Sequence, residues 1–191
     1  AELSREVRDA GIQDDRLRGL LEKKQEAADT DAALARAIEN AGNVTLGYFF
    51  HITAKEVGHL TEEQIVAGEN EVANGRFQMV RAKEGADRSH LIRAYAPQPN
   101  LALLSAAGEN SGYFNTFPDS DGVIRWSPLV IKFRDNYYSS LALSLLVQYL
   151  DWPMLSLGLA EYGVESIALN KMIIPTDESG RLLVNYLGPA K

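Results

Sequence analysis

The sequence contains no cysteine among its 191 residues. Disulfide bonds, thiolate nucleophiles and cysteine-ligated metal sites are therefore excluded together. The absence is compatible with an oxidising compartment, where a spare thiol would be a liability, but many cytosolic domains also lack cysteine. The cysteine count alone thus leaves the compartment open.

The chain also lacks an excess of positive charge and any long apolar run. Its 19 lysines and arginines stand against 26 aspartates and glutamates, which gives a formal net charge of −7 and disfavours nucleic acid as a partner. No apolar run approaches the roughly 20 residues that cross a bilayer, and the opening AELSREVRDAG has no signal-peptide core. Because the chain starts in charged sequence without a start methionine, we expect a piece of a longer protein.

Motifs that bind metals, nucleotides or acyl groups are also missing. The histidines at positions 51, 59 and 90 show neither the HxxxH nor the HxH spacing of a metal site on one element. The glycines form no GxGxxG and no phosphate-binding loop. The segment YSSLALS lacks the glycine-flanked elbow of a serine nucleophile, so Ser139 and Ser140 are interpreted as helix caps. We therefore expect no catalytic residue, no metal and no cofactor.

Two regions differ in composition. Residues 1–28 are mostly charged, with a thin apolar stripe of Leu17, Leu20 and Leu21, which predicts a charged helical arm or N-terminal helices. Residues 29–191 hold nearly all the strand and helix patterns and are predicted to form a single domain. A composition of 46% hydrophobic and 24% charged residues is ordinary for a globular chain with a sizeable core.

The segment ADTDAALARAIENAGN predicts a helix that Asp29 or Thr30 caps and Gly42 ends. The run NVTLGYFF follows at once and predicts a strand covered on both faces. Further helices are predicted after Thr61, over residues 101–107 and over LALSLLVQYL, while FQMVRAK fits strand or helix.

Near the end of the chain, two β-rich runs flank an ESG turn and predict a C-terminal hairpin. The fold class expected is therefore α/β, a mixed β-sheet with helices packed on its faces.

The stretch NTFPDSDGVIRWSP, residues 115–128, allows three interpretations. As a calcium loop it lacks two ligands, because Phe117 and Pro128 fall at the first and twelfth positions. A hydrolase would need two converging carboxylates, yet the candidate acids lie at predicted turns or helix ends: Asp119, Asp121, Asp151, Asp177 and Glu178. A turn between two strands is favoured, with Arg125 paired to Asp119 or a neighbouring carboxylate; the rival role for Arg125 is to bind an anionic ligand.

Taken in order, the blocks DAALARAIENAGNVTLGYFF, SGYFNTFPDSDGVIRWSPLV, YYSSLALSLL and IPTDESGRLLVNYLGP resemble the CHASE domain of the second type. This family takes its name from cyclases/histidine kinases associated sensory extracellular domains of bacterial membrane receptors. The resemblance covers about residues 29–190 in scattered blocks. The family's motif positions fall on Asp119, Asp121, Gly122, Arg125, Ser140, Pro175, Asp177, Gly180, Asn185, Gly188 and Pro189.

The resemblance implies an extracytoplasmic, periplasmic module of an inner-membrane protein, attached by flanking transmembrane helices to a cytoplasmic cyclase or kinase. It implies no catalysis and no settled ligand, so the motif positions are expected to be structural. The family usually opens with an acidic strand and a tryptophan-proline-arginine segment upstream. Here the charged residues 1–28 stand in that place, and one or two strands of the parent domain are expected to be missing.

Three functions follow as hypotheses. The first is a sensor in which an unknown small molecule or environmental signal changes the arrangement of two such domains, with the leucine stripe of the arm as a homodimer seam. The second is a structural dimerisation or interaction module without a small-molecule ligand. The third is a carboxylate-dependent hydrolase, which requires two carboxylates roughly 5–9.5 Å apart around a cleft.

Overall fold

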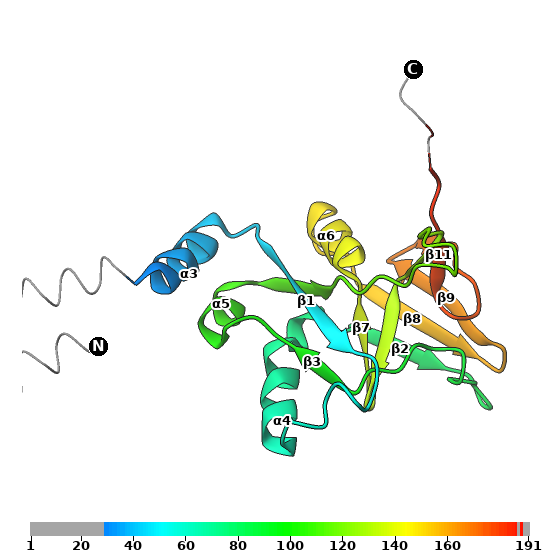
Figure 1. The fold of residues 1–191 in the computed structure, drawn as a ribbon. Helices are drawn as coiled ribbons and strands as arrows, with labels where there is room; N and C mark the ends of the chain where they lie inside the picture. Colours follow the sequence, from blue (N-terminus) through cyan, green and yellow to red (C-terminus); the bar gives the residue numbers. More distant parts are fainter. Residues whose placement is uncertain (1–28, 187, 189–191) are drawn as a thin grey trace, which may run out of the picture.

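The computed structural model describes residues 29–186 and 188 (Figure 1). The predicted arm over residues 1–28, its leucine stripe and Pro189 lie outside the described residues, so the predicted division into an arm and one domain stays a prediction. The helices of the described part are α3 (Thr30–Ala41), α4 (Glu62–Glu71), the 3-10 helix η1 (Ala73–Gly75), α5 (Ala102–Ala107) and α6 (Leu141–Tyr149). None of these helices is long and apolar enough to cross a membrane.

The helices begin at the polar residues that the sequence indicates. The Asp29 side chain accepts a hydrogen bond from the Ala32 N–H at the start of α3, and α3 ends at Gly42, whose φ is 63°. Thr61 forms a capping box with Gln64 at the start of α4. Ser140 accepts from a backbone N–H in the first turn of α6. These predictions are confirmed.

One sheet has three strands in the order β3-β1-β4, which are β3 (Ala96–Gln98), β1 (Thr45–His51) and β4 (Asn110–Tyr113). Strand β1 runs antiparallel to β3 and parallel to β4. The prediction that β1 is covered on both faces is wrong. Tyr48 and Phe50 are buried on one face, but Phe49, which points to the other, is 36% exposed.

A second sheet has four strands in the order β10-β9-β8-β2, which are β10 (Met172–Ile174), β9 (Gly163–Leu169), β8 (Leu155–Ala160) and β2 (Met79–Ala82). The segment FQMVRAK thus contains a strand, and β2 pairs in parallel with β8. The two sheets and their helices confirm the predicted α/β class with mixed sheets.

The two strands that flank the ESG turn do not pair with each other, so the predicted C-terminal hairpin is wrong. Strand β10 forms a hairpin with β9, whereas β11 (Arg181–Leu183), beyond the turn, pairs with β5 (Trp126–Pro128). The reason is a close approach at the turn: Gly180 has a φ of 73°, and a Cβ there would lie 2.4 Å from Val130 Cγ1. The turn therefore packs closely against Val130, and the Leu129 N–H donates to the Gly180 carbonyl at 2.9 Å, which places β11 beside β5.

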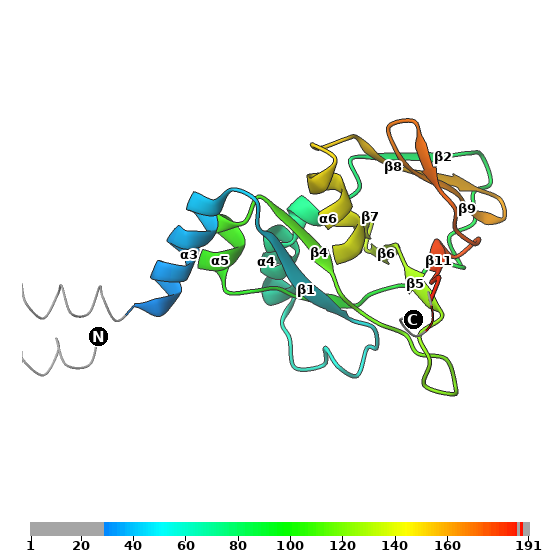
Figure 2. The same ribbon diagram turned by 90° about the horizontal axis from the view of Figure 1, so that it is seen from above.

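The hairpin of β6 (Val130–Phe133) and β7 (Asn136–Ser139) lies between the two larger sheets, with α6 beside it (Figure 2). One hydrophobic cluster includes Leu143 and Val147 of α6 together with strands β8 and β9. A second cluster combines the aromatic residues of β1 and β4 with those of β6 and β7. The β6–β7 hairpin contributes to both clusters and therefore couples the two halves of the molecule.

Candidate functional site

The DSDG segment forms a tight turn. The Gly122 N–H donates to the Asp119 carbonyl at 2.8 Å, and the Asp119 N–H donates to the Val123 carbonyl at 2.9 Å. Gly122 has a φ of 81°, which a residue with a side chain adopts at a cost. The strands on either side do not pair with each other, however. Strand β4 pairs with β1 and β5 pairs with β11, so the predicted strand-turn-strand unit is wrong although its turn is present.

Arg125 binds both acids of this turn. Its NH1 group donates to Asp119 Oδ2 at 2.8 Å and to Asp121 Oδ1 at 2.9 Å, and its NH2 group donates to Asp121 Oδ2 at 2.7 Å. The predicted pair with Asp119 is confirmed. The Arg125 guanidinium holds the pKa of the Asp121 carboxyl below its usual range, and the Val123 N–H adds to this effect. Ligand binding by Arg125 stays a prediction.

Asp177 organises the ESG turn in the same way. Its Oδ1 accepts from the N–H groups of Ser179, at 3.0 Å, and of Arg181, at 2.8 Å. Its Oδ2 accepts from the Arg181 guanidinium, with Nε at 2.8 Å and NH2 at 2.7 Å. The same guanidinium lies over the Trp126 ring, 5.1 Å from its centroid, and so ties β11 to β5. Asp121 and Asp177 are thus held by different arginines at separate turns.

The remaining motif residues lie in caps and loops. Ser140 caps α6, Pro175 and Asn185 lie outside the strands, and Gly188 has a φ of 76°. Asp151, one of the candidate acids, occupies the left-handed region just after α6 with a φ of 61°. Within residues 29–186 and 188, no group of three histidine or acidic side chains is placed to bind a metal ion.

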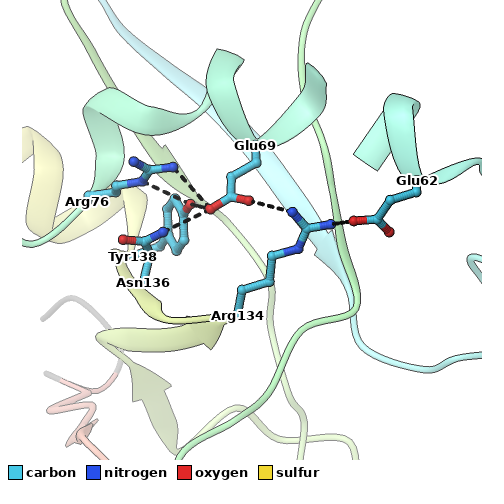
Figure 3. A network of polar contacts seen from close by, with 6 residues as sticks. All are labelled: Glu62, Glu69, Arg76, Arg134, Asn136 and Tyr138. Carbon is cyan, nitrogen blue, oxygen red and sulfur yellow. Dashed lines mark hydrogen bonds and ion pairs between the residues drawn. The ribbon is translucent and has the colours of Figure 1, made fainter. Parts of the chain in front are cut away.

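Sequence reasoning missed a polar network around Glu69 (Figure 3). Glu69 lies on α4 and is only 8% exposed. Its Oε1 accepts from Arg76 NH2 at 3.1 Å, from Asn136 Nδ2 at 2.9 Å and from the Tyr138 hydroxyl at 3.2 Å. Its Oε2 accepts from Arg134 NH1 at 3.2 Å. One buried carboxylate therefore joins α4 to the chain after η1 and to the β6–β7 hairpin.

A second acid and a buried tyrosine also belong to this network. Arg134 also pairs with the exposed Glu62, which lies about two turns before Glu69 on the same face of α4, so it bridges two acids of the same helix. Tyr138 is fully buried, and burial raises its pKa to about 12, so its hydroxyl stays protonated well into the alkaline range. Arg76 donates its Nε to that hydroxyl at 3.0 Å and lies 5.6 Å from the ring centroid. Two cations thus neutralise Glu69 in a site that excludes most water.

The sequence carried one signal for this network. Ile65, Glu69 and Val72 recur at helical spacing, and only the middle one is charged. An acid in the inward stripe of a short helix indicates a buried partner, because an unpaired buried carboxylate is costly. The partners themselves could not be named, because Arg134 and Asn136 lie 65 and 67 positions further along the chain.

A pocket of about 580 Å³ lies beside the network. Three cationic side chains line it, from Arg76, Arg88 and Lys132, against one acid, Asp135. Phe77, Val80 and Ala82 provide an apolar wall. The pocket thus combines a concave shape and converging charged groups with one apolar wall.

A model of the CHASE2 domain family matches residues 7–191. No curated protein and no solved structure matches the chain. CHASE2 domains are extracellular sensor domains of receptors and are not catalytic, which agrees with acids that are held at turns by Arg125 and Arg181. The match spans nearly all of the sequence. The chain therefore belongs to the CHASE2 domain family.

Proposed function

We propose that this chain is the periplasmic sensing domain of a bacterial inner-membrane receptor with a cytoplasmic output of the adenylate/guanylate cyclase or histidine kinase type. A small molecule or another stimulus on the outer side changes the internal arrangement of the domain, and flanking membrane helices carry the change inward. The observation that carries the proposal is a pocket with converging polar groups next to a buried network, inside a domain of a sensor family.

The network offers a physical route for such a signal. Arg76 lines the pocket and also binds Glu69, so a ligand that contacts this guanidinium alters the balance of charge around the buried carboxylate. Glu69 belongs to α4, α4 contacts α5, and α5 packs against α3 near the N-terminal end of the described chain (Figure 1). A stimulus shifts this arrangement only as far as it binds one state better than the other.

A second candidate, an interaction module, draws support from an exposed apolar surface. Tyr149 at the end of α6 is 85% exposed and Ile173 on β10 is 69% exposed. The turn between β9 and β10 is bound to the segment after α6 through Asn170, whose side chain accepts from the Met154 N–H at 3.1 Å. Sedimentation velocity separates the candidates: a purely structural module self-associates through this face without any ligand, and Tyr149→Ser weakens that association.

The experiment that tests the sensing proposal has two steps. Thermal unfolding of the chain is first measured against a panel of metabolites, peptides, ions and pH values, because a compound that binds only the native state raises the unfolding temperature by mass action. The active compounds are then added to membranes that carry the whole receptor, and its cyclase or kinase activity is measured. We expect the stabilising compounds to change that activity. A receptor output indifferent to every stabilising compound contradicts the proposal.

A further inference from the structure

We propose that the pocket between β2 and the β6–β7 hairpin binds a small organic anion, a carboxylate or a phosphate ester with an apolar body. The inference deepens the proposed sensing function and rests on it for its biological meaning, but the binding itself is a property of the chain. It starts from a contrast in charge. The chain carries a formal net charge of −7, whereas the pocket is lined by three cations and a single acid.

Two of the three cations have only neutral partners. Arg88 donates Nε to the Tyr137 hydroxyl at 2.9 Å and NH1 to the Ala86 carbonyl at 3.2 Å. Lys132 donates its Nζ to the Arg134 carbonyl. Within the described residues, no carboxylate lies within 4.0 Å of the charged nitrogens of Arg88 or Lys132. Their charges therefore stay available to an anion, with which they form charge-assisted hydrogen bonds.

The third cation, Arg76, differs because Glu69 already neutralises it, at 3.1 Å. Its side chain is still 33% exposed, so the guanidinium presents an edge to the pocket while it holds the buried acid. The expected anion therefore binds mainly to Arg88 and Lys132, and Arg76 is the group through which binding reaches the Glu69 network.

The apolar wall of the pocket further narrows the chemical class of the expected ligand. Phe77 is buried, whereas Val80 is 40% exposed and faces the pocket from the free edge of the second sheet. An inorganic ion would leave this wall in contact with water. A ligand with a hydrocarbon body beside its anionic group covers the wall and gains from its removal from water. A cavity of about 580 Å³ accepts a body of that kind.

The test is calorimetric titration of the chain at low ionic strength with benzoate and phenyl phosphate. Benzamide serves as the neutral analogue of the same shape, and inorganic phosphate serves as an anion without a body. We expect benzoate or phenyl phosphate to bind measurably at about 10 mM or below and more tightly than either control. The better of the two ligands identifies the anionic group. Binding of neither, binding of benzamide as tight as that of benzoate, or equal binding of inorganic phosphate overturns the proposal.

Matched variants locate the site. Arg88→Gln and Lys132→Gln each remove one charge from the pocket, and each is expected to weaken binding roughly tenfold. Arg36→Gln, on the exposed side of α3, makes the same change of net charge away from the pocket and is expected to leave binding unchanged. Equal losses in all three variants would mean that only the overall charge matters, which refutes the site. Arg88→Lys keeps the charge and restores part of the affinity, which separates electrostatics from a folding defect.

Failure of the anion site and failure of the proposed sensing function give different experimental results. Anion binding that depends on Arg88 but leaves receptor output unchanged refutes the sensing role and keeps the site. Receptor output that responds to other stimuli, combined with no binding of these probes, keeps the sensing role and refutes the site.

Discussion

Neutralising Glu69 is expected to destabilise the domain far more than the same change at Glu62. Both acids lie on α4 and both bind Arg134, so Glu69→Gln and Glu62→Gln remove the same charge from the same helix and the same partner. Their surroundings differ. The Glu69 side chain is 11% exposed and that of Glu62 is 71% exposed. The comparison therefore contrasts a buried carboxylate that has four hydrogen-bond donors with an exposed one that has a single arginine partner.

The expected loss of unfolding free energy in Glu69→Gln follows from the contacts of the carboxylate. Glu69 accepts four hydrogen bonds, two of them from arginines whose side chains are only about one third exposed. A glutamine keeps one acceptor but turns an N–H₂ group toward a cation, which leaves buried positive charge uncompensated. Breaking a buried charge network costs about 3–5 kcal/mol, and the partial exposure of the arginines lowers the expected cost to about 2–4 kcal/mol. The exposed pair of Glu62 contributes about 0–1 kcal/mol.

The assay is equilibrium unfolding in urea, followed by circular dichroism, with the midpoint converted to a free energy through a shared slope. For a chain of this size, each kcal/mol also lowers the melting temperature by about 2–4 °C, which gives an independent measure. A loss below about 1 kcal/mol for Glu69→Gln, or an equal loss for Glu62→Gln, refutes the claim that the network stabilises the α4 attachment. A salt titration adds a check, because the exposed pair should be screened and the buried network should not.

Three further predictions address other parts of the account. Gly112→Ala places a Cβ 2.6 Å from the backbone of the first residue of α6 and should cost about 1–3 kcal/mol in urea unfolding, whereas Gly58→Ala, with its nearest neighbour at 3.8 Å, should stay within about 0.5 kcal/mol. NMR spectra should show a pKa for Asp121 below its ordinary value, and Arg125→Gln should raise that pKa. The pairing of Asp121 stabilises the fold above the unfolded-state pKa of about 3.9, and this stability is lost as pH falls through the lower pKa of the folded state. Burial raises the pKa of Tyr138 to about 12, so its NMR ring signals should remain those of the neutral phenol at about pH 10, where an exposed tyrosine is half ionised. The stability that the neutral phenol contributes should be lost only as pH rises from about 10 toward the pKa of the folded state.

Local chemistry explains which parts of the fold were predictable. The caps at Asp29, Thr61 and Ser140 depend on atoms within three residues, so the sequence suffices to find them. The turns at Gly122 and Gly180 are local for the same reason, because a positive φ and nearby acids define them. The predicted pairing of Arg125 with Asp119, six positions away, rests on the same short range.

Pairing between distant segments was not predictable. The partner of β11 is β5, and the close packing of Gly180 against Val130 that accompanies this pairing joins segments far apart in the sequence. Glu69 presents the same difficulty in the site, because its partners approach from hairpin residues that no spacing rule relates to α4. The pocket could not be predicted either, because Arg88 and Lys132 come to line the same pocket only in the folded chain.

The central claim, that this domain lies on the outer side of the inner membrane where the proposed stimulus is present, is tested most directly by cysteine labelling in whole cells. The 191 residues contain no cysteine, so Tyr149→Cys introduces one defined thiol of the domain at a side chain that is 85% exposed. Ser144→Cys, at a position that is 2% exposed, is the buried control, and the unsubstituted receptor reports any thiols elsewhere. A charged maleimide that cannot cross the inner membrane should label Tyr149→Cys in intact cells and should label Ser144→Cys only after denaturation. Labelling of Tyr149→Cys only after the inner membrane is opened would contradict the account.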